Sequence, residues 1–276
     1  MKETLNKEID MLDLTEKNNI LRLCNETRKD ILEMVYSAGS GHMGGSLSAV
    51  EILTVLYNSI LKPEDKFILS KGHAAPLYYS ILSSKGYIDK SELKNLRNIK
   101  SNLEGHPSRK IPGVDSGSGS LGQGLSIANG MALAKKIDER EGKVFCLLGD
   151  GELEEGQVWE AAMTAGYYKL NNVIAIVDYN NLQIDGNINE VMSPEPIKNK
   201  FIAFNWDVID VDGHDVQMLY NGFKKALQSN KPTCIIAHTI KGKGISFMED
   251  NVAWHGKAPN YDEYLNAKEE LNNEIN

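Results

Sequence analysis

The sequence contains few cysteines, and this shortage excludes two classes of small stabilised domain. Only three occur, Cys24, Cys146 and Cys234, and no two of them form a C-x-x-C pair. A disulfide framework and a structural zinc site are therefore disfavoured, and a reducing cytoplasm is the expected location. Because Cys146 and Cys234 lie inside apolar runs, we expect buried and unreactive thiols.

The chain also lacks a long apolar run and an excess of positive charge. No stretch approaches the roughly 18 apolar residues of a membrane-spanning helix, and residues 1–14 lack the apolar core of a signal peptide. The 38 acidic against 30 basic side chains give a net charge of −8. Neither a membrane nor nucleic acid is therefore an expected partner, although a local anion site is compatible with this balance.

What the sequence does contain is typical of a folded globular chain. Its hydrophobic share is 41%, with only 8 prolines, which excludes disordered and collagen-like proteins. A length of 276 residues corresponds to one or two domains. Because no internal repeat or low-complexity tract occurs, we predict a single domain over residues 1–276. It begins with a helical segment at 1–37 and ends in a short, charged, helical tail at 259–276.

The first third of the chain predicts helices around a short strand. The expected helices span residues 15–36, 48–61 and 73–85, and a buried strand is expected at 67–70. Ser48, followed three residues later by Glu51, resembles a capping box that opens the second helix. The glycine-rich segment before it, residues 38–45, ends the first helix.

The remainder predicts alternating strands and helices. Apolar strands are expected at residues 143–148, 172–178, 206–211 and 233–237, with helices at 157–170 and 216–228. Strands that are apolar on both faces belong to a covered parallel sheet, and a helix between two of them forms a right-handed βαβ unit. The predicted fold class is α/β, a doubly wound, mostly parallel sheet with helices on both faces. Such sheets bind ligands at the carboxyl ends of their strands.

Two polar motifs follow neighbouring strands of this predicted sheet. Gly149-Asp150-Gly151 lies directly after the strand at 143–148, and Asn180-Asn181 follows the strand at 172–178. The 28 residues between them suffice for one helix and one strand, so Asp150 and Asn180 are expected side by side. Two hard oxygen ligands, and a glycine that lets backbone amides approach, suit a magnesium ion carrying a diphosphate. A backbone carbonyl just beyond Asn180 would supply a further ligand.

Each motif alone has a simpler interpretation as an ordinary turn. Their joint placement, one helix and one strand apart, favours the metal site. A dinucleotide site and a P-loop are disfavoured, because no G-x-G-x-x-G follows a strand and no Walker lysine motif is present.

Gly-Asp-Gly followed by Asn-Asn is also the signature of thiamine diphosphate enzymes. Here GDGELEEG (149–156) and VDYNNLQIDG (177–186) resemble transketolase specifically. Five further motifs are similar to transketolase and stand in the family order: SGHMGG (40–45), LSKGH (69–73), EGHP (104–107), SLGQG (120–124) and AWHG (253–256). The resemblance extends from about Arg28 to Ala258. It implies the thiamine diphosphate-binding fold and transfer of a two-carbon ketol unit from a ketose phosphate to an aldose phosphate.

The resemblance also implies a cofactor site. Asp150 and Asn180 match side-chain ligands of Mg²⁺ (or of Ca²⁺ or Mn²⁺), and the Leu182 carbonyl matches a third ligand. Positions that match contacts to thiamine diphosphate are His73, Gly149, Gly151 and His255 at the diphosphate, and Gly119, Leu121 and Ile184 at the rings. Glu155 matches a catalytic acid near the subunit interface that helps organise cofactor activation. An ordinary acid at a helix N-terminus explains its charge equally well.

Four of the six histidines lie inside glycine-flanked motifs, namely His42, His73, His106 and His255. Histidine donates, accepts and relays protons near neutral pH, as ketol transfer requires. By resemblance, His42 and His255 line the reacting carbons and His106 faces the hydroxyl groups of the donor. Each of them alone is equally well explained as a structural histidine.

Three other polar residues carry weaker signals. His214 in DGHD (212–215) fits a turn at a helix start, with Asp215 as the cap. His238 ends a predicted strand beside KGKG (241–244). We assign no role to His238 or Lys241.

The resemblance further implies that a domain of the complete enzyme is supplied by another chain. In the family, a second, pyrimidine-binding domain supplies the glutamate that protonates the cofactor's aminopyrimidine ring and most residues that hold the sugar phosphate. Residues 259–276 are too few to form that domain. We therefore predict the N-terminal subunit of a split transketolase. Its partner chain would carry the pyrimidine-binding and C-terminal domains in an α2β2 assembly, across a large apolar interface.

Several alternatives stay open at this point. The chain could serve a related enzyme, such as a deoxyxylulose-phosphate synthase, a 2-oxo-acid dehydrogenase or a transketolase acting on unusual sugars. The histidine set favours ketol transfer over the first two. A non-catalytic cofactor-binding or regulatory subunit is the alternative from another class, and the intact Asp150 and Asn180 argue against it.

Overall fold

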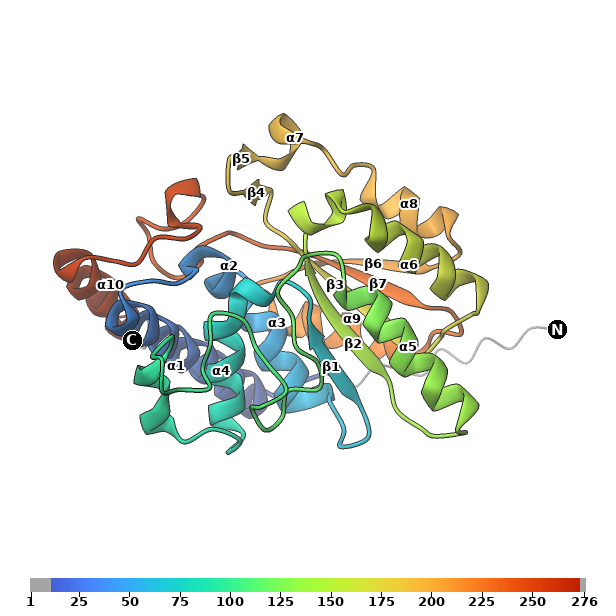
Figure 1. Ribbon diagram of the computed structural model, residues 1–276, viewed down its shortest axis with the longest axis horizontal. Coiled ribbons are helices and arrows are strands. Elements are labelled where there is room, and N and C mark those ends of the chain that lie inside the picture. Colours follow the sequence, from blue (N-terminus) through green and yellow to red (C-terminus); the bar gives the residue numbers. More distant parts are fainter. Residues whose placement is uncertain (1–10, 274–276) are drawn as a thin grey trace.

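The computed structural model describes residues 11–273, and a five-stranded parallel sheet forms its centre (Figure 1). The strands run in the order β1-β2-β3-β7-β6. Their bounds are β1 Lys66–Leu69, β2 Val144–Gly149, β3 Val173–Tyr179, β7 Thr233–His238 and β6 Asp207–Asp212. A separate antiparallel pair, β4 Leu182–Gln183 and β5 Gly186–Asn187, follows β3. The predicted α/β class is confirmed.

Helices connect and cover these strands. The α-helices are α1 Leu14–Ala38, α2 Met43–Leu47, α3 Val50–Val55, α4 Ala75–Ser84, α5 Gly124–Ile137, α6 Gly156–Tyr167, α7 Ile188–Val191, α8 Ile197–Ala203, α9 Val216–Gln228 and α10 Tyr261–Asn273. Shorter or wider turns are η1 Leu56–Ile60, which is a π-helix, and the 3-10 helices η2 Gly72–Ala74, η3 Lys90–Asn95, η4 Gly151–Glu154 and η5 Val252–Trp254.

Alternate residues of each strand pack on opposite faces of the sheet. In β2, Phe145 and Leu147 join the core that contains buried residues of α1, α3, α4 and α9. Val144 and Cys146 of the same strand face the core formed with α5, α6 and α8. Both faces of β2, β3 and β7 are therefore buried, which is why these strands are apolar without alternation, whereas the edge strand β6, expected to be apolar, exposes its three aspartates. The sheet is doubly wound, as predicted.

The N-terminal helix matches its prediction at both ends. Asp13 and Glu16 form a capping box at the start of α1, and Gly39 ends it in the left-handed conformation, at φ 60°. The part of the predicted segment 1–37 that precedes Met11 lies outside the described residues.

The capping box expected at Ser48 and Glu51 is wrong. Residue 49, not Ser48, precedes α3, and no side chain caps that helix. Instead the Ser48 hydroxyl donates to Asp178 across the fold, at 2.6 Å. The Glu51 carboxylate pairs with Arg28 and with His214. Long-range polar contacts therefore engage both side chains, and the predicted helix 48–61 consists of α3 followed by the π-helix η1.

The predicted tail 259–276 is helical over α10 and packs against α1. Tyr264 stacks on Tyr36 with ring centroids 4.0 Å apart, and Asn25 donates to the Leu271 carbonyl at 2.9 Å. The last three residues of the tail lie outside the described range. From residue 11 to 273, no helix is both long enough and apolar enough to cross a membrane.

The three cysteines are free and buried, as predicted. Burial raises the pKa of the Cys24 thiol to about 12 and holds those of Cys146 and Cys234 well above the usual range. Because the thiolate is the reactive form, these groups are unreactive at neutral pH.

Candidate active site

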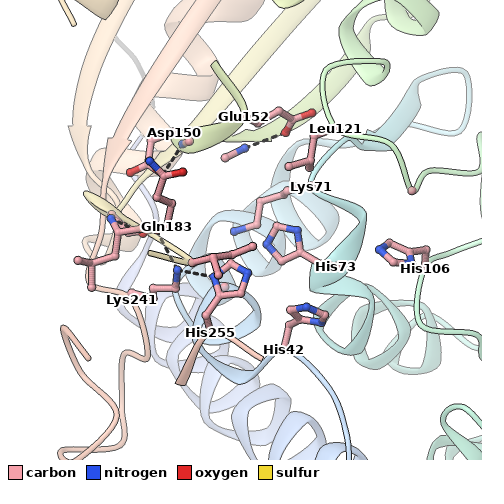
Figure 2. Close-up of a pocket in the computed structure, with 17 residues that line it drawn as sticks. His42, Lys71, His73, His106, Leu121, Asp150, Glu152, Gln183, Lys241 and His255 are labelled. Atoms are coloured by element: carbon pink, nitrogen blue, oxygen red, sulfur yellow. Dashed lines mark hydrogen bonds between the residues drawn. The ribbon is translucent and has the colours of Figure 1, made fainter. Parts of the chain in front are cut away.

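Asp150 and Asn180 lie at the carboxyl edge of the sheet, as their positions in the sequence predict. Asp150 directly follows β2, and Asn180 directly follows β3. The parallel register pairs Gly149 with Asp178, so the two chain ends leave the sheet side by side. They open into a pocket of about 250 Å³ (Figure 2).

The structure brings nearly every predicted site residue to this pocket. The predicted residues that line it are His42, His73, His106, Gly119, Leu121, Gly149, Asp150, Gly151, Asn180, Leu182, Ile184 and His255. Glu155 is the exception. It is exposed at the start of α6, and its side chain caps no helix backbone N–H.

Asp150 is a buried carboxylate beside a second one. Its oxygens accept hydrogen bonds from the backbone N–H groups of Gly151, at 2.8 Å, and Asn181, at 2.6 Å. Burial, and then the nearby charge of Asp178, raise the pKa of Asp150 to about 6. A cation at this carboxylate would relieve both effects.

Asn180 has its side-chain amide fixed by neighbours. Its Nδ2 donates to Asp178 at 3.2 Å, and its Oδ1 accepts from the Leu182 N–H at 3.1 Å. Within residues 11–273, no group of three His, Cys, Asp or Glu side chains is arranged to hold a metal. A metal here would therefore need the mixed set of one carboxylate, one amide oxygen and a backbone carbonyl, which suits a hard divalent cation.

Asp178 lies beneath this site and receives several hydrogen bonds. Lys71 pairs with it, and the hydroxyls of Ser48 and Thr239 donate to it. Burial alone would raise the pKa of Asp178, but the Lys71 ammonium and these hydrogen bonds outweigh burial and hold it below the usual range. The buried Lys71–Asp178 ion pair therefore keeps Asp178 charged next to Asn180.

Lys241 contacts both the segment that follows Asn180 and the histidine cluster of the pocket. Its Nζ donates to the Leu182 carbonyl at 2.9 Å and lies 2.8 Å from Nδ1 of His255 (Figure 2). An ammonium group can only donate, so Nδ1 of His255 accepts and the neutral ring carries its proton on Nε2. Burial and the nearby Lys71 lower the pKa of Lys241 to about 8.

Three of the histidines form a close cluster. The ring centroids of His42, His73 and His255 lie 5.3 to 5.4 Å apart. Burial is the main cause that lowers their pKa values, to about 4 for His42, to about 3 for His255, and well below the usual range for His73. Nearby cations add to it: Arg97 for His42, Lys241 for His255 and Lys71 for His73. These rings are therefore neutral at physiological pH.

His106 stands apart from this cluster, to one side of the pocket (Figure 2). It also lines an adjoining hollow, together with Gly119 and Gln123. Burial and Arg97 lower the pKa of His106 as well.

Five further residues line the pocket that the sequence analysis did not assign: Gly45, Lys71, Glu152, Gln183 and Lys241. Four of them lie inside the motifs that resemble transketolase, and Lys241 lies in the KGKG segment. Their nearness to predicted site residues in the sequence was therefore the one signal that could have identified them. Gly45 has a steric reason, because a Cβ there would lie 3.1 Å from Nε2 of His73. The lysines could not be singled out, since their burial is set by the fold.

The remaining histidines lie outside the pocket lining. His214 accepts from the Ile240 N–H at 2.8 Å and contacts Glu51 at 3.0 Å. Asp215 caps α9, as predicted. His238 ends β7 and packs edge-on against Tyr179.

A family model and individual relatives both identify this chain as similar to transketolases. Residues 21–275 match the family described as "Transketolase, thiamine diphosphate binding domain". An apulose-4-phosphate transketolase subunit of Phocaeicola vulgatus is 39% identical, over 97% of this chain and 96% of that protein. The 6-deoxy-6-sulfo-D-fructose transketolase subunit SqwG of Clostridium sp. is 41% identical, over 88% of this chain and 90% of that protein.

Solved transketolases share the fold. The crystal structure of transketolase from Campylobacter jejuni matches with a TM-score of 0.86 and 35% sequence identity, over 92% of this chain but only 43% of that one. The chain thus spans about two fifths of the length of that transketolase and almost all of the two shorter relatives. The chain belongs to the family of transketolase thiamine diphosphate binding domains.

Proposed function

We propose that this chain is the N-terminal, diphosphate-binding subunit of a two-chain transketolase. The complete enzyme would transfer a two-carbon ketol unit from a ketose phosphate to an aldose phosphate. The observation that carries the proposal is the pocket in which Asp150 and Asn180 lie opposite a cluster of neutral histidines. We further propose that residues 1–276 form one diphosphate-binding domain.

We propose that Asp150, Asn180 and the Leu182 carbonyl hold Mg²⁺, or Ca²⁺ or Mn²⁺ in its place. The raised pKa of Asp150 supports this, because a buried carboxylate beside another one favours a nearby cation. The diphosphate would then lie against the N–H groups that follow Gly149, with the Lys241 ammonium and the His73 ring as further donors and the His255 ring beside them. These groups fit thiamine diphosphate, which supplies a carbanion and an electron sink when bound.

The apolar part of the pocket suits the cofactor rings. Leu121 and Ile184 line it together with Gly119. Ile184 is 67% exposed, although it is a large apolar side chain. We propose that these three residues form the wall around the aminopyrimidine and thiazolium rings, which would cover Ile184.

The histidines would act on the sugar. In our proposal, His42 and His255 donate hydrogen bonds to oxygens next to the reacting carbons, and His106 contacts the donor's other hydroxyls. Neutral imidazoles can donate and accept at the same ring, which matches the exchange of hydroxyl protons during transfer. The low pKa values support donation by neutral rings over donation by imidazolium.

We propose that α5 and α6 contact the partner chain. On α5, Ile127 and Met131 are only partly buried and Ile137 is exposed, whereas Met163 and Tyr167 are exposed on α6. An exposed apolar stripe of this kind marks a protein interface. Glu155, at the start of α6, lies next to this surface, which supports its proposed role at the subunit boundary.

The partner would carry the pyrimidine-binding and C-terminal domains, in an α2β2 assembly in the cytoplasm. Support comes from the two relatives of this length, each named as a transketolase subunit. They are named for different sugars, one a sugar phosphate and one a sulfo sugar, so a transketolase that acts on an unusual sugar is the second candidate.

Reconstitution tests this proposal. The chain is mixed with the product of the adjacent gene, Mg²⁺ and thiamine diphosphate, and transfer from xylulose 5-phosphate to ribose 5-phosphate is followed. We expect turnover only when both chains are present. Turnover by this chain alone would contradict the two-chain proposal. Normal cofactor binding without turnover on any ketose donor, including phosphorylated and sulfonated ketoses, would instead favour a regulatory subunit.

A further inference from the structure

Glu152 is a buried carboxylate that neither the metal nor the sugar chemistry uses. It follows the Gly149-Asp150-Gly151 motif within η4 and is 2% exposed. Figure 2 shows its side chain turned away from Lys241 and the histidines, toward the part of the pocket that contains Leu121. A buried carboxylate requires several hydrogen-bond donors to offset its lost hydration.

Three donors from three separate segments converge on Glu152. Its Oε1 accepts from the Gly122 N–H at 2.8 Å and from the hydroxyl of Ser70. Its Oε2 accepts from the Gly149 N–H at 3.0 Å. The Ser70 hydroxyl in turn accepts from the Gly124 N–H at 3.2 Å. Residues 122 and 124 are thus both linked to this one carboxylate.

Each of these segments also supplies pocket residues. Ser70 precedes Lys71 at the end of β1, and Gly149 precedes Asp150 at the end of β2. Residues 119–124 form the loop that leads into α5 and present Leu121 to the pocket. The carboxylate therefore joins the loop to the two strand ends.

The loop is shaped to approach this carboxylate closely. Gly122 has φ +82°, a conformation that favours glycine. A Cβ on Gly124 would overlap the Ser70 side chain. Gly122 and Gly124 are thus both needed to bring the N–H groups of the loop to Glu152 and Ser70.

We propose that Glu152 is a positioning residue that holds the loop 119–124, and with it Gly119 and Leu121, in place for the cofactor rings. The role of these rings rests on the proposed function. A carboxylate suits the task because Oε1 accepts from the Gly122 N–H while Oε2 accepts from the Gly149 N–H. In a glutamine, the amide nitrogen would face either Gly122 or Gly149 and leave one N–H without an acceptor.

The test compares Glu152→Gln and Ser70→Ala with the surface control Glu269→Gln, all in the full-length chain. Hydrogen exchange of the peptide covering 119–124 is measured on the chain alone. The KM of thiamine diphosphate is measured in the reconstituted two-chain enzyme at saturating Mg²⁺. For Glu152→Gln we expect faster exchange confined to the loop and a KM for the cofactor raised about tenfold, the size expected for one unsatisfied buried donor. The kcat and the KM of the donor sugar should change less than about twofold.

Ser70→Ala keeps the bonds from Gly122 and Gly149 to Glu152 but leaves the Gly124 N–H without its acceptor, so it should give the same pattern with changes of similar size. If Glu152→Gln does not fold, Ser70→Ala alone tests whether this hydrogen-bond network holds the loop. Wild-type exchange and wild-type cofactor KM in the folded variants would overturn the proposal, as would faster exchange spread over the whole chain. If the proposed function is wrong, the wild-type pair of chains shows no ketol transfer. The hydrogen-exchange measurement on the isolated chain still tests the positioning role of Glu152 in that case.

Discussion

Replacing Asp150 by asparagine should reveal that this carboxylate destabilises the metal-free fold. Its pKa is raised from 3.8 to about 6 by burial and by Asp178. The unfolded chain therefore ionises first as pH rises, and the free energy of unfolding of the wild type falls between these two values. Since one pKa unit corresponds to about 1.4 kcal/mol, the whole difference amounts to about 3 kcal/mol, and about 1 kcal/mol of it appears between pH 5 and pH 8.

Asp150→Asn removes this titration. It also replaces one acceptor oxygen by an amide nitrogen, so that the N–H of either Gly151 or Asn181 loses its acceptor, which subtracts a pH-independent amount of about 1 kcal/mol or more. The stability of the variant relative to the wild type should therefore rise by about 1 kcal/mol from pH 5 to pH 8. Urea unfolding followed by circular dichroism, in the presence of a chelator, measures this difference at each pH.

A matched control is the neighbouring buried aspartate. Asp178→Asn should destabilise the chain by about 3 kcal/mol or more, because it leaves the buried Lys71 ammonium without its charged partner. A relative stability of Asp150→Asn that stays flat or falls with rising pH would refute the view that Asp150 is an unfavourably placed carboxylate that favours a bound cation.

Three further predictions concern the pocket and its surroundings. Lys241→Met should raise the pKa of His255, seen by NMR titration, because a nearby cation is lost, and should weaken cofactor binding about tenfold or more in calorimetry. His106→Asn should raise the KM of the donor sugar while leaving the affinity for thiamine diphosphate unchanged, as judged by steady-state kinetics and calorimetry. Tyr167→Lys should prevent association with the partner in size-exclusion chromatography without changing the thermal unfolding of the isolated chain, because its side chain is 78% exposed.

The parts of the site that the sequence predicts are those fixed by the ends of strands. Asp150 and Asn180 follow apolar runs that form buried strands, so the parallel sheet determines where both residues lie. Family motifs extend this to the histidines. The places of these metal-site and histidine residues could be predicted because each residue lies in a short motif directly before or after a strand or helix.

Other features could not be predicted because long-range contacts decide them. Ser48 has the local pattern of a helix cap, yet its hydroxyl bonds to Asp178, 130 positions further along the chain. The helix α5 was missed, since it contains Gly130, follows a glycine-rich loop and has no side-chain cap. The part played by Lys241 depends on its burial beside His255 and Leu182, which only the assembled fold creates.

In our proposal, this chain supplies the diphosphate half of a two-chain transketolase. The most direct measurement titrates the partner chain into a fixed amount of this chain, with Mg²⁺ and thiamine diphosphate, and records the rate of ketol transfer. We predict no transfer by either chain alone and a rate that rises with added partner to a plateau at equimolar amounts. Full activity of the partner without this chain, or a rate unaffected by Asp150→Ala in the mixture, would contradict the account.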